Sequence, residues 1–501
     1  MLALGSTPLV RSYFARGLIA AATLLLACES SSPVDEGPAE AESEVVAERE
    51  AEPLPEALEH QVASYLEQYG RHWPEFRFHG TVLVARGEHI AVDQAFGTSD
   101  LVEDLPNETG TLFRVGTLSA QLTAAAVMRL VEAGELSLAD PVSRHLPDWP
   151  DGSAITLEHL LAHRSGIPNF TDDLMFEVWK RGPRTLQDTM ALFRGHPLEF
   201  EPGSDTSPSN SNYVVLGAIL EAVAGKDYEQ VVREQVLQPL SLEHTHYAMS
   251  DEPQAIGMAF HEDEYLEVVN RVHPAAFGSA GGWLSTSGDL LRLTQGIAHD
   301  QLLSRHGTMR MQGLTDDNLG YGWAPSEVLG HAAISWPGLI DGFNSAVLHI
   351  PEDDTTIIVL SNSEVIPAGQ IVEDIAALAY GEESPRWEEA QVVPVPLEDQ
   401  LYAVGRYVPT RGTEEAMAAA GADTSVIHEV FVRRVDDHLV FDVPGHARKH
   451  LHPLAPTRFF FKDGVQTRAE LVTRVDQSPI LVLRAGEGEV RFVRVDEPAK
   501  G

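Results

Sequence analysis

The sequence predicts an α+β domain over residues 57–385, followed by a small all-β domain over residues 395–498. Strand-like segments lie near both ends of the first domain, and helical apolar spacing dominates between them. Strands at both ends with helices between them favour one sheet shared by the two ends. The Pro-rich stretch ESPRWEEAQVVPVPLEDQ separates the second domain, which consists of short strand-like runs.

The first 28 residues have the pattern of an export signal. Two arginines precede an apolar run over residues 17–27, which is short for a membrane span but fits the apolar region of a signal peptide. The run ends in Leu-Leu-Ala-Cys28, which resembles the lipobox of bacterial lipoproteins, whose cysteine is lipidated. We therefore expect residues 1–28 to be a lipoprotein signal peptide and Cys28 to carry a lipid anchor. An ordinary export signal with an incidental cysteine is the alternative.

Acidic residues are in large excess. Residues 29–56 are rich in Glu, Ser, Pro and Ala and lack aromatic residues, so we expect a disordered acidic linker. Over the whole chain, 35 Lys and Arg residues stand against 75 Asp and Glu residues, a formal net charge of −40. Such a surface repels phosphate backbones and argues against nucleic acid as a partner. Cys28 is the only cysteine, which excludes an intrachain disulfide and a cysteine-based metal site.

The expected elements follow in order along the chain. Apolar spacing predicts a helix over residues 57–69, and alternation predicts a strand hairpin over residues 78–100 with Gly-Glu at its turn. Helical patterns then continue from residue 111 to about 297. A second hairpin is predicted over residues 345–363, with Pro-Glu-Asp-Asp at its turn. The last segment contains the strand-like runs VFVRRVDDHLVFDV, TRFFFKD, AELVTRV, ILVLRA and VRFVRV.

Five ordered blocks resemble the serine β-lactamase and penicillin-binding-protein-like family, especially its class C β-lactamase and esterase branch. They are LFRVGTLSAQLTAAAVMRLVEAGELSLADPVSRHLPDWP, ITLEHLLAHRSGIPNF, PGSDTSPSNSNYVVLGAILEAVAGKDYEQVV, GSAGGWLSTSGDLLRL and ISWPGLIDGFNSAVLHIPEDDTTIIVLSN. The resemblance covers residues 57–381 and implies a β-lactamase/transpeptidase-like domain, an antiparallel sheet with helices. The C-terminal segment resembles the lipocalin-like domain appended to many members.

The family's chemistry needs four side chains that this sequence lacks. A Ser at a helix N-terminus attacks a carbonyl, and a Lys three residues later takes its proton. A Tyr or Ser of the second motif relays protons, and a Lys or His followed by a Gly on the third-motif strand holds the substrate. The positions that match these motifs here are Thr117, Ala120, Pro208, Asn210, Trp336 and Gly338. The resemblance thus implies that one cleft holds these positions, with Asn210 near Thr117, but that its catalytic motifs are degenerate.

No other pattern restores the missing chemistry. None of the five lysines follows a serine by three residues, and no Gly-x-Ser-x-Gly pattern occurs. Thr117 and Ser209 remain as hydroxyls, and His163 is either a substitute base or a structural residue of the scaffold. His244 and His246 have strand spacing without a third ligand nearby, which is weak support for zinc. The sequence therefore assigns no confident catalytic residue, no metal and no cofactor.

These observations favour an exported pseudoenzyme, lipid-anchored at the periplasmic or outer face of the bacterial cell envelope. Its old cleft would bind a small molecule, peptide or glycan, or the cleft or the C-terminal β domain would bind a protein partner. Trp336 in place of a cation either changes what the cleft holds or plugs it. One alternative is an active esterase, amidase or peptidase that uses Thr117 or Ser209. A second is a structural or interaction module of the envelope.

Overall fold

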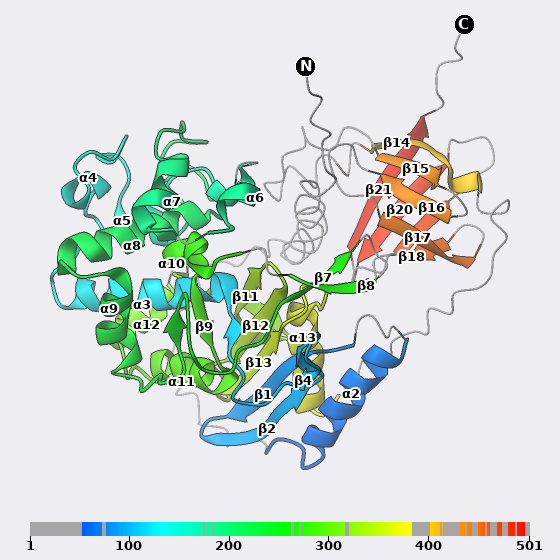
Figure 1. The fold of residues 1–501 in the computed structure, drawn as a ribbon, viewed down its shortest axis with the longest axis horizontal. Helices are drawn as coiled ribbons and strands as arrows, with labels where there is room; N and C mark the ends of the chain where they lie inside the picture. Colours follow the sequence, from blue (N-terminus) through cyan, green and yellow to red (C-terminus); the bar gives the residue numbers. More distant parts are fainter. Residues whose placement is uncertain are drawn as a thin grey trace, which may run out of the picture. The chain divides into compact units, whose positions relative to one another are not determined.

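The sheet of the first domain joins the two ends of that domain, as Figure 1 shows. The computed structural model describes residues 53–72, 77–173, 176–182, 184–261, 265–269, 272–315, 320–382, 401–410, 413, 430–435, 438–442, 449–455, 458–460, 468–472, 479–485 and 488–495. The chain divides after Arg386 into a first unit, Glu52–Arg386, and a second unit that contains the strands after residue 400. The predicted signal peptide, Cys28 and nearly all of the predicted linker lie outside the described residues. None of the described helices is long and apolar enough to cross a membrane.

Six antiparallel strands form the central sheet in the order β10-β11-β12-β13-β1-β2. They are β1 (Gly80–Arg86), β2 (His89–Phe96), β10 (Ala324–Val328), β11 (His331–Ile340), β12 (Phe343–Ile350) and β13 (Thr355–Ser361). Strand β1 pairs with β13, and Gly80 lies opposite Ser361. Both predicted hairpins are therefore present, and their pairing confirms the shared sheet. The α+β prediction for this domain is confirmed.

Helices pack around this sheet. Helix α2 (Leu58–His72) contacts β2 and α13 (Ala368–Ala379), which in turn packs on β12 and β13. Helix α11 (Ser287–Ala298) contacts β13 and β1. The remaining helices are η3 (Gly116–Leu118), α3 (Ser119–Glu132), α4 (Val142–His145), α5 (Leu157–Leu161), η4 (Phe170–Asp172), α6 (Phe176–Trp179), α7 (Leu186–Phe193), α8 (Asn210–Ala224), α9 (Tyr228–Val232), η5 (Arg233–Leu237), η6 (Pro274–Phe277), α10 (Gly278–Gly281) and α12 (Arg305–Met311). The short strands are β3 (Thr98–Asp100), β4 (Leu105–Pro106), β5 (Phe113–Arg114), β6 (His246–Tyr247), β7 (Met258–His261), β8 (Tyr265–Val268) and β9 (Trp283–Ser285).

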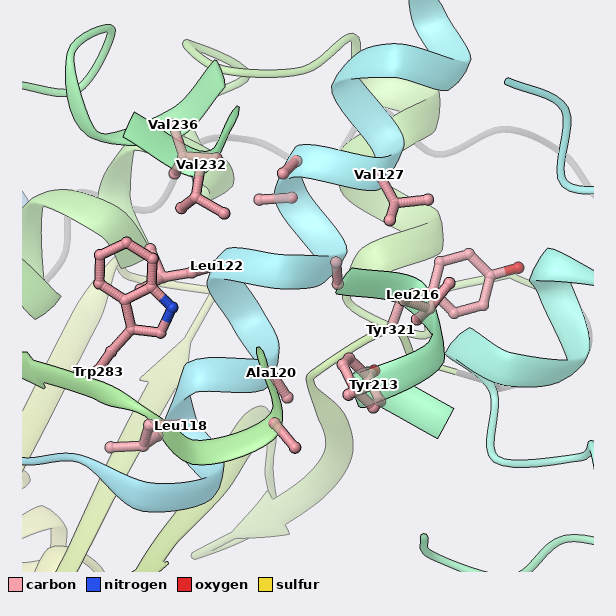
Figure 2. Packing of buried hydrophobic residues seen from close by; sticks show 14 of the residues in the cluster. Leu118, Ala120, Leu122, Val127, Tyr213, Leu216, Val232, Val236, Trp283 and Tyr321 are labelled. Atoms are coloured by element: carbon pink, nitrogen blue, oxygen red, sulfur yellow. The ribbon is translucent and has the colours of Figure 1, made fainter. Parts of the chain in front are cut away.

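Helix α3 runs through the core of the helical part. It contacts α8 and α10, and most of its residues are buried on every side. Figure 2 shows Leu122 of α3 near Trp283 on one side of the helix and Tyr213 on the other. Even its polar residues Ser119, Gln121 and Thr123 are buried, so the first half of the helix is enclosed by protein. The start of α3 is thereby held in a fixed place next to the sheet.

The second unit is a closed barrel in which each strand pairs with the next and β14 pairs with β21. Its strands are β14 (Gly405–Pro409), β15 (Val430–Val435), β16 (His438–Asp442), β17 (Lys449–Ala455), β18 (Arg458–Phe460), β19 (Arg468–Val472), β20 (Ile480–Ala485) and β21 (Gly488–Val495). The aromatic side chains of Tyr407, Phe459 and Phe492 are buried in its core. The predicted strand runs are present, whereas β14 and β17 were not predicted. The likeness of this barrel to a lipocalin stays a prediction.

Candidate active-site cleft

Two glycines bring η3 into backbone contact with β11. Gly116 has φ +52°, and a Cβ built on it would lie 2.4 Å from the carbonyl oxygen of Leu339. A Cβ built on Gly338 would lie 2.5 Å from the carbonyl oxygen of Val115. Any side chain at either position would therefore push the two segments apart. This close approach places Thr117, the residue at the nucleophile position, directly against the third-motif strand.

The hydroxyl of Thr117 closes a free edge of β11. Strand β10 pairs only with residues 331–335 of β11, so the later residues of β11 have no strand partner on that side among the described residues. The Oγ1 of Thr117 donates a hydrogen bond to the carbonyl of Pro337 at 2.8 Å. The N–H of Leu339 donates a hydrogen bond to the same Oγ1 at 3.3 Å. Pro337 has no N–H to offer, which is tolerated at an edge of a sheet.

Trp336, at the position of the third-motif cation, also binds the backbone of η3. Its indole Nε1 donates to the carbonyl oxygen of Thr117 at 3.0 Å. Its ring is stacked on the ring of His163, with centroids 6.4 Å apart and 6° between the planes. Instead of a positive charge, the strand thus presents a neutral aromatic ring that is itself half-buried.

His163 is a hydrogen-bond acceptor in this arrangement. It has φ +56°, and its Nδ1 accepts from the N–H of Ser209 at 3.1 Å and lies 3.2 Å from Nδ2 of Asn212. The hydroxyl of Ser165 donates to Oδ1 of Asn212 and so fixes which end of that amide faces the ring. The proton of the neutral imidazole must then reside on Nε2. Burial lowers the pKa of His163 to about 4, which makes it a weak base at neutral pH.

None of the second-motif residues Pro208, Ser209 and Asn210 has a side chain placed to relay a proton. Pro208 is exposed and has no group that could relay a proton. The hydroxyl of Ser209 is buried and has no partner among the described residues. Asn210 donates its hydrogen bonds to another segment. Its backbone N–H donates to Oδ1 of Asn169, and its Nδ2 donates to Oγ1 of Thr171. The expected proximity of Asn210 to Thr117 stays a prediction.

No lysine of the first unit takes the place of the missing base. Ala120 is only 4% exposed and belongs to the apolar core. Lys180 is buried with its Nζ 2.6 Å from Asp341, and Lys226 bonds Glu234 on the surface. Both amino groups are thus held by carboxylates. Ser119, the other hydroxyl of this turn, is fully buried and accepts from the N–H of Trp283.

The pair His244 and His246, weighed above as metal ligands, is held by a carboxylate. His244 Nδ1 and His246 Nε2 each lie 2.9 Å from a different oxygen of Glu252. The bond to Glu252 raises the pKa of His244 above its ordinary value. Within the described ranges, no group of three or more His, Cys, Asp and Glu side chains could hold a metal ion.

Sequence comparison establishes the family of this chain. The family model described as Beta-lactamase matches residues 65–381, well over half of the chain. The chain belongs to the β-lactamase family. Penicillin-binding protein 4* of Bacillus subtilis (strain 168) is 25% identical over 448 residues, which cover 83% of this chain and 95% of that protein. The predicted serine β-lactamase and penicillin-binding-protein-like resemblance is therefore confirmed.

Solved structures give the same result. The penicillin-binding protein from Bacillus halodurans is 28% identical with a TM-score of 0.57, covering 63% of this chain and 98% of its own. The octameric penicillin-binding protein homologue from Pyrococcus abyssi has a TM-score of 0.60 at 23% identity. It covers 86% of this chain and 99% of its own, and shows likeness of fold. The β-lactamase/transpeptidase-like fold is thus confirmed.

Sequence analysis did not find the residues that bind the Thr117 hydroxyl. Pro337 and Leu339 contribute only backbone groups, and these groups carry no side-chain signature. The one available signal was the proline directly after the third-motif position, because a proline marks a strand edge that lacks a ladder partner. Asn212, which orients His163, was also missed.

Proposed function

We propose that this member of the β-lactamase family is non-catalytic and that its cleft serves binding. The hydrogen bonds of the Thr117 hydroxyl carry the proposal, because the proton goes to the carbonyl of Pro337 and one lone pair accepts from Leu339. A nucleophile needs a base for its proton, and a separate N–H must be free for the oxyanion that develops. Here the proton of the hydroxyl is bonded to a carbonyl, which cannot take it up. The N–H of Leu339 is not free for an oxyanion, because it is bonded to the hydroxyl itself.

The size of the loss supports the same conclusion. Removal of a general base typically costs about 10²–10⁴ in rate, and removal of a whole catalytic unit about 10⁶. The Lys position is Ala120 in the core, the Tyr position is Pro208, and the cation position is Trp336. With all of these changed together, we expect no measurable turnover of β-lactams, esters or amides.

We further propose a location for this binding role. The lipobox-like Leu-Leu-Ala-Cys28 and the acidic segment after it support an exported protein, anchored by lipid to the bacterial cell envelope. Residues 29–52 would then be a spacer between the membrane and the folded units, because Leu54 is already buried in the first unit. The ligand would be a small molecule, a peptide or a glycan, and a protein partner at the cleft or the second unit is compatible with the same role.

The main alternative is an active serine-hydrolase-type enzyme, which family membership favours. It would use the hydroxyl of Thr117 or Ser209 with a base outside the usual motifs. Ser209 lies next to His163, but the residue is only 3% exposed. Its N–H, rather than its Oγ, contacts the imidazole ring. A structural or interaction module of the envelope is the second alternative.

An acylation assay on the full chain separates these possibilities. The protein is incubated with a fluorophosphonate probe and with a fluorescent penicillin, since only an activated hydroxyl forms the covalent adduct. We expect no label on the wild type, Thr117→Val or Ser209→Ala. Label on the wild type that disappears in Thr117→Val, with the fold intact, would overturn the proposal. Loss of label in Ser209→Ala would instead assign the alternative nucleophile.

A combined variant tests whether the altered positions explain the inactivity. Thr117→Ser alone should stay unlabelled, because no base is added. Together with Ala120→Lys, Pro208→Tyr and Trp336→His it restores nucleophile, base, relay and cation, and we expect label only in combination. Turnover by Thr117→Ser alone would contradict the argument.

A further inference from the structure

Arg114 is a half-buried cation without a carboxylate partner in the part of the chain that the structure describes. It ends β5, three residues before Thr117. Its Nη1 donates to the carbonyl of Val272 at 2.8 Å, and its Cζ lies 5.9 Å from the centroid of the Phe343 ring. Burial lowers the pKa of Arg114 to about 10. Five N–H groups of a guanidinium seek acceptors, and a charge taken from water is costly without a counter-ion.

His273 supplies a second donor at the same place. Its N–H binds the carbonyl of Lys180 at 2.7 Å, which fixes the backbone of this residue. Its Nδ1 accepts from the N–H of Ala275 at 3.3 Å, so the neutral ring carries its proton on Nε2. This Nε2–H has no partner among the described residues. Burial and then the positive charges of Arg114 and Arg184 lower the pKa of His273.

The charge balance at this place is opposite to that of the whole chain. The chain has a formal net charge of −40, yet the groups that act on His273 are two arginines. Lys180, whose carbonyl accepts from the N–H of His273, has its amino group on the carboxylate of Asp341. Arg114 at the end of β5 bonds the carbonyl of Val272, the residue directly before His273, so the guanidinium lies beside the backbone of His273. Both side chains keep N–H groups that have no partner among the described residues.

We propose that Arg114 and His273 form a binding site for an oxyanion, a carboxylate or a phosphate group of the ligand. The planar guanidinium suits the paired oxygens of either group, and the imidazole Nε2–H adds a third direction. The site is distinct from the third-motif cation position, which Trp336 occupies here. This inference rests on the proposed binding role. Strand β5, which carries Arg114, leads into η3, which carries Thr117, and so links the anion site to the proposed ligand site.

Inorganic phosphate and acetate serve as probes for this site. The full chain is titrated with each anion at constant ionic strength, with chloride as the reference, and melting temperature and binding heat are measured. Arg114→Gln removes the charge, and His273→Asn removes Nε2–H while an oxygen can still cap Ala275. Arg194→Gln is the matched control, because Arg194 also binds a carbonyl, that of Asp148, and lies over an aromatic ring, that of Trp149.

We expect phosphate to stabilise the wild type and Arg194→Gln, with an affinity about tenfold or more weaker in Arg114→Gln and His273→Asn. Stabilisation by acetate as well would identify carboxylates as ligands, whereas an effect of phosphate alone would identify phosphate groups. The proposal is overturned if neither anion stabilises the wild type beyond chloride, or if both site variants bind like the wild type. Should Arg114→Gln fail to fold, His273→Asn decides.

Failure of this site can be told apart from failure of the non-catalytic role. A covalent label on Thr117 would overturn the non-catalytic role and leave phosphate binding unchanged. Absence of anion binding would overturn the site at Arg114 and His273 and leave the labelling result unchanged.

Discussion

Replacement of Thr117 by valine should destabilise the first unit, although the two side chains have nearly the same shape. The change deletes the bond to the carbonyl of Pro337 at 2.8 Å and the bond from Leu339 at 3.3 Å. A hydrogen bond contributes about 0.5–1.5 kcal/mol, and water can reach this edge, so we expect a loss of about 1–2 kcal/mol. For a unit of this size that lowers the melting temperature by a few degrees.

Calorimetry on the full chain, with the transition of the first unit followed, measures this loss. Thr117→Ser is the matched control, because it keeps the hydroxyl and removes only a methyl group. Trp336→Phe removes the bond from Nε1 to the carbonyl of Thr117. Since both bonds join η3 to β11, the double variant should deviate from additivity by about 0.5 kcal/mol or more. A Thr117→Val protein as stable as the wild type, with additive effects, would refute the idea that this hydroxyl is a structural bond.

Three further outcomes are expected. Cys28→Ser should move the protein from the membrane to the soluble envelope fraction, and a wild type that already fractionates as soluble would contradict the anchor. Lys180→Met should lower the free energy of unfolding by about 1–3 kcal/mol, because it leaves the buried carboxyl of Asp341, whose pKa burial raises to about 8, without its partner. Lys180→Met with Asp341→Leu should recover most of the loss, as urea unfolding would measure. Between about pH 6.5 and pH 4 the unfolded state binds a proton that His163 in the folded state does not, so stability falls on acidification. His163→Gln should reduce this fall by an amount on the order of 2 kcal/mol, and an unchanged slope would contradict the lowered pKa.

The elements that sequence analysis predicted best were those with local signals. The first hairpin of the sheet alternates and the second consists of two β-rich runs. Both have turn residues between their strands, and both are present. Strands β14 and β17 were missed for a physical reason. The segment Lys449–Ala455 contains a proline and two histidines, and Gly405–Pro409 is short and half polar. Their strand conformation comes from partners in the closed barrel, and such distant pairing leaves no local pattern.

From the sequence, the candidate site could be predicted only as a set of motif positions whose residues differ from those of the family. The motif alignment could name Thr117 and Trp336, because their neighbours match the family. It could not predict that the Thr117 hydroxyl binds Pro337 and Leu339, because that contact depends on how η3 meets an edge of β11 about 220 residues later. It also could not predict that Trp336 would stack on His163. Contacts of this kind follow from tertiary packing.

The pairing of β1 with β13 also bears on how the chain reaches its native state. The hydroxyl of Ser361 donates to the carbonyl of His79, a residue 282 positions earlier in the sequence. The central strands therefore cannot meet until nearly the whole first unit has been synthesised, and contacts of such long range form slowly. A chain interrupted within the helical part would retain β1 and β2 with an unpaired edge, a known starting point for aggregation. Premature termination or cleavage there should thus yield insoluble fragments, so that only the complete unit escapes quality control.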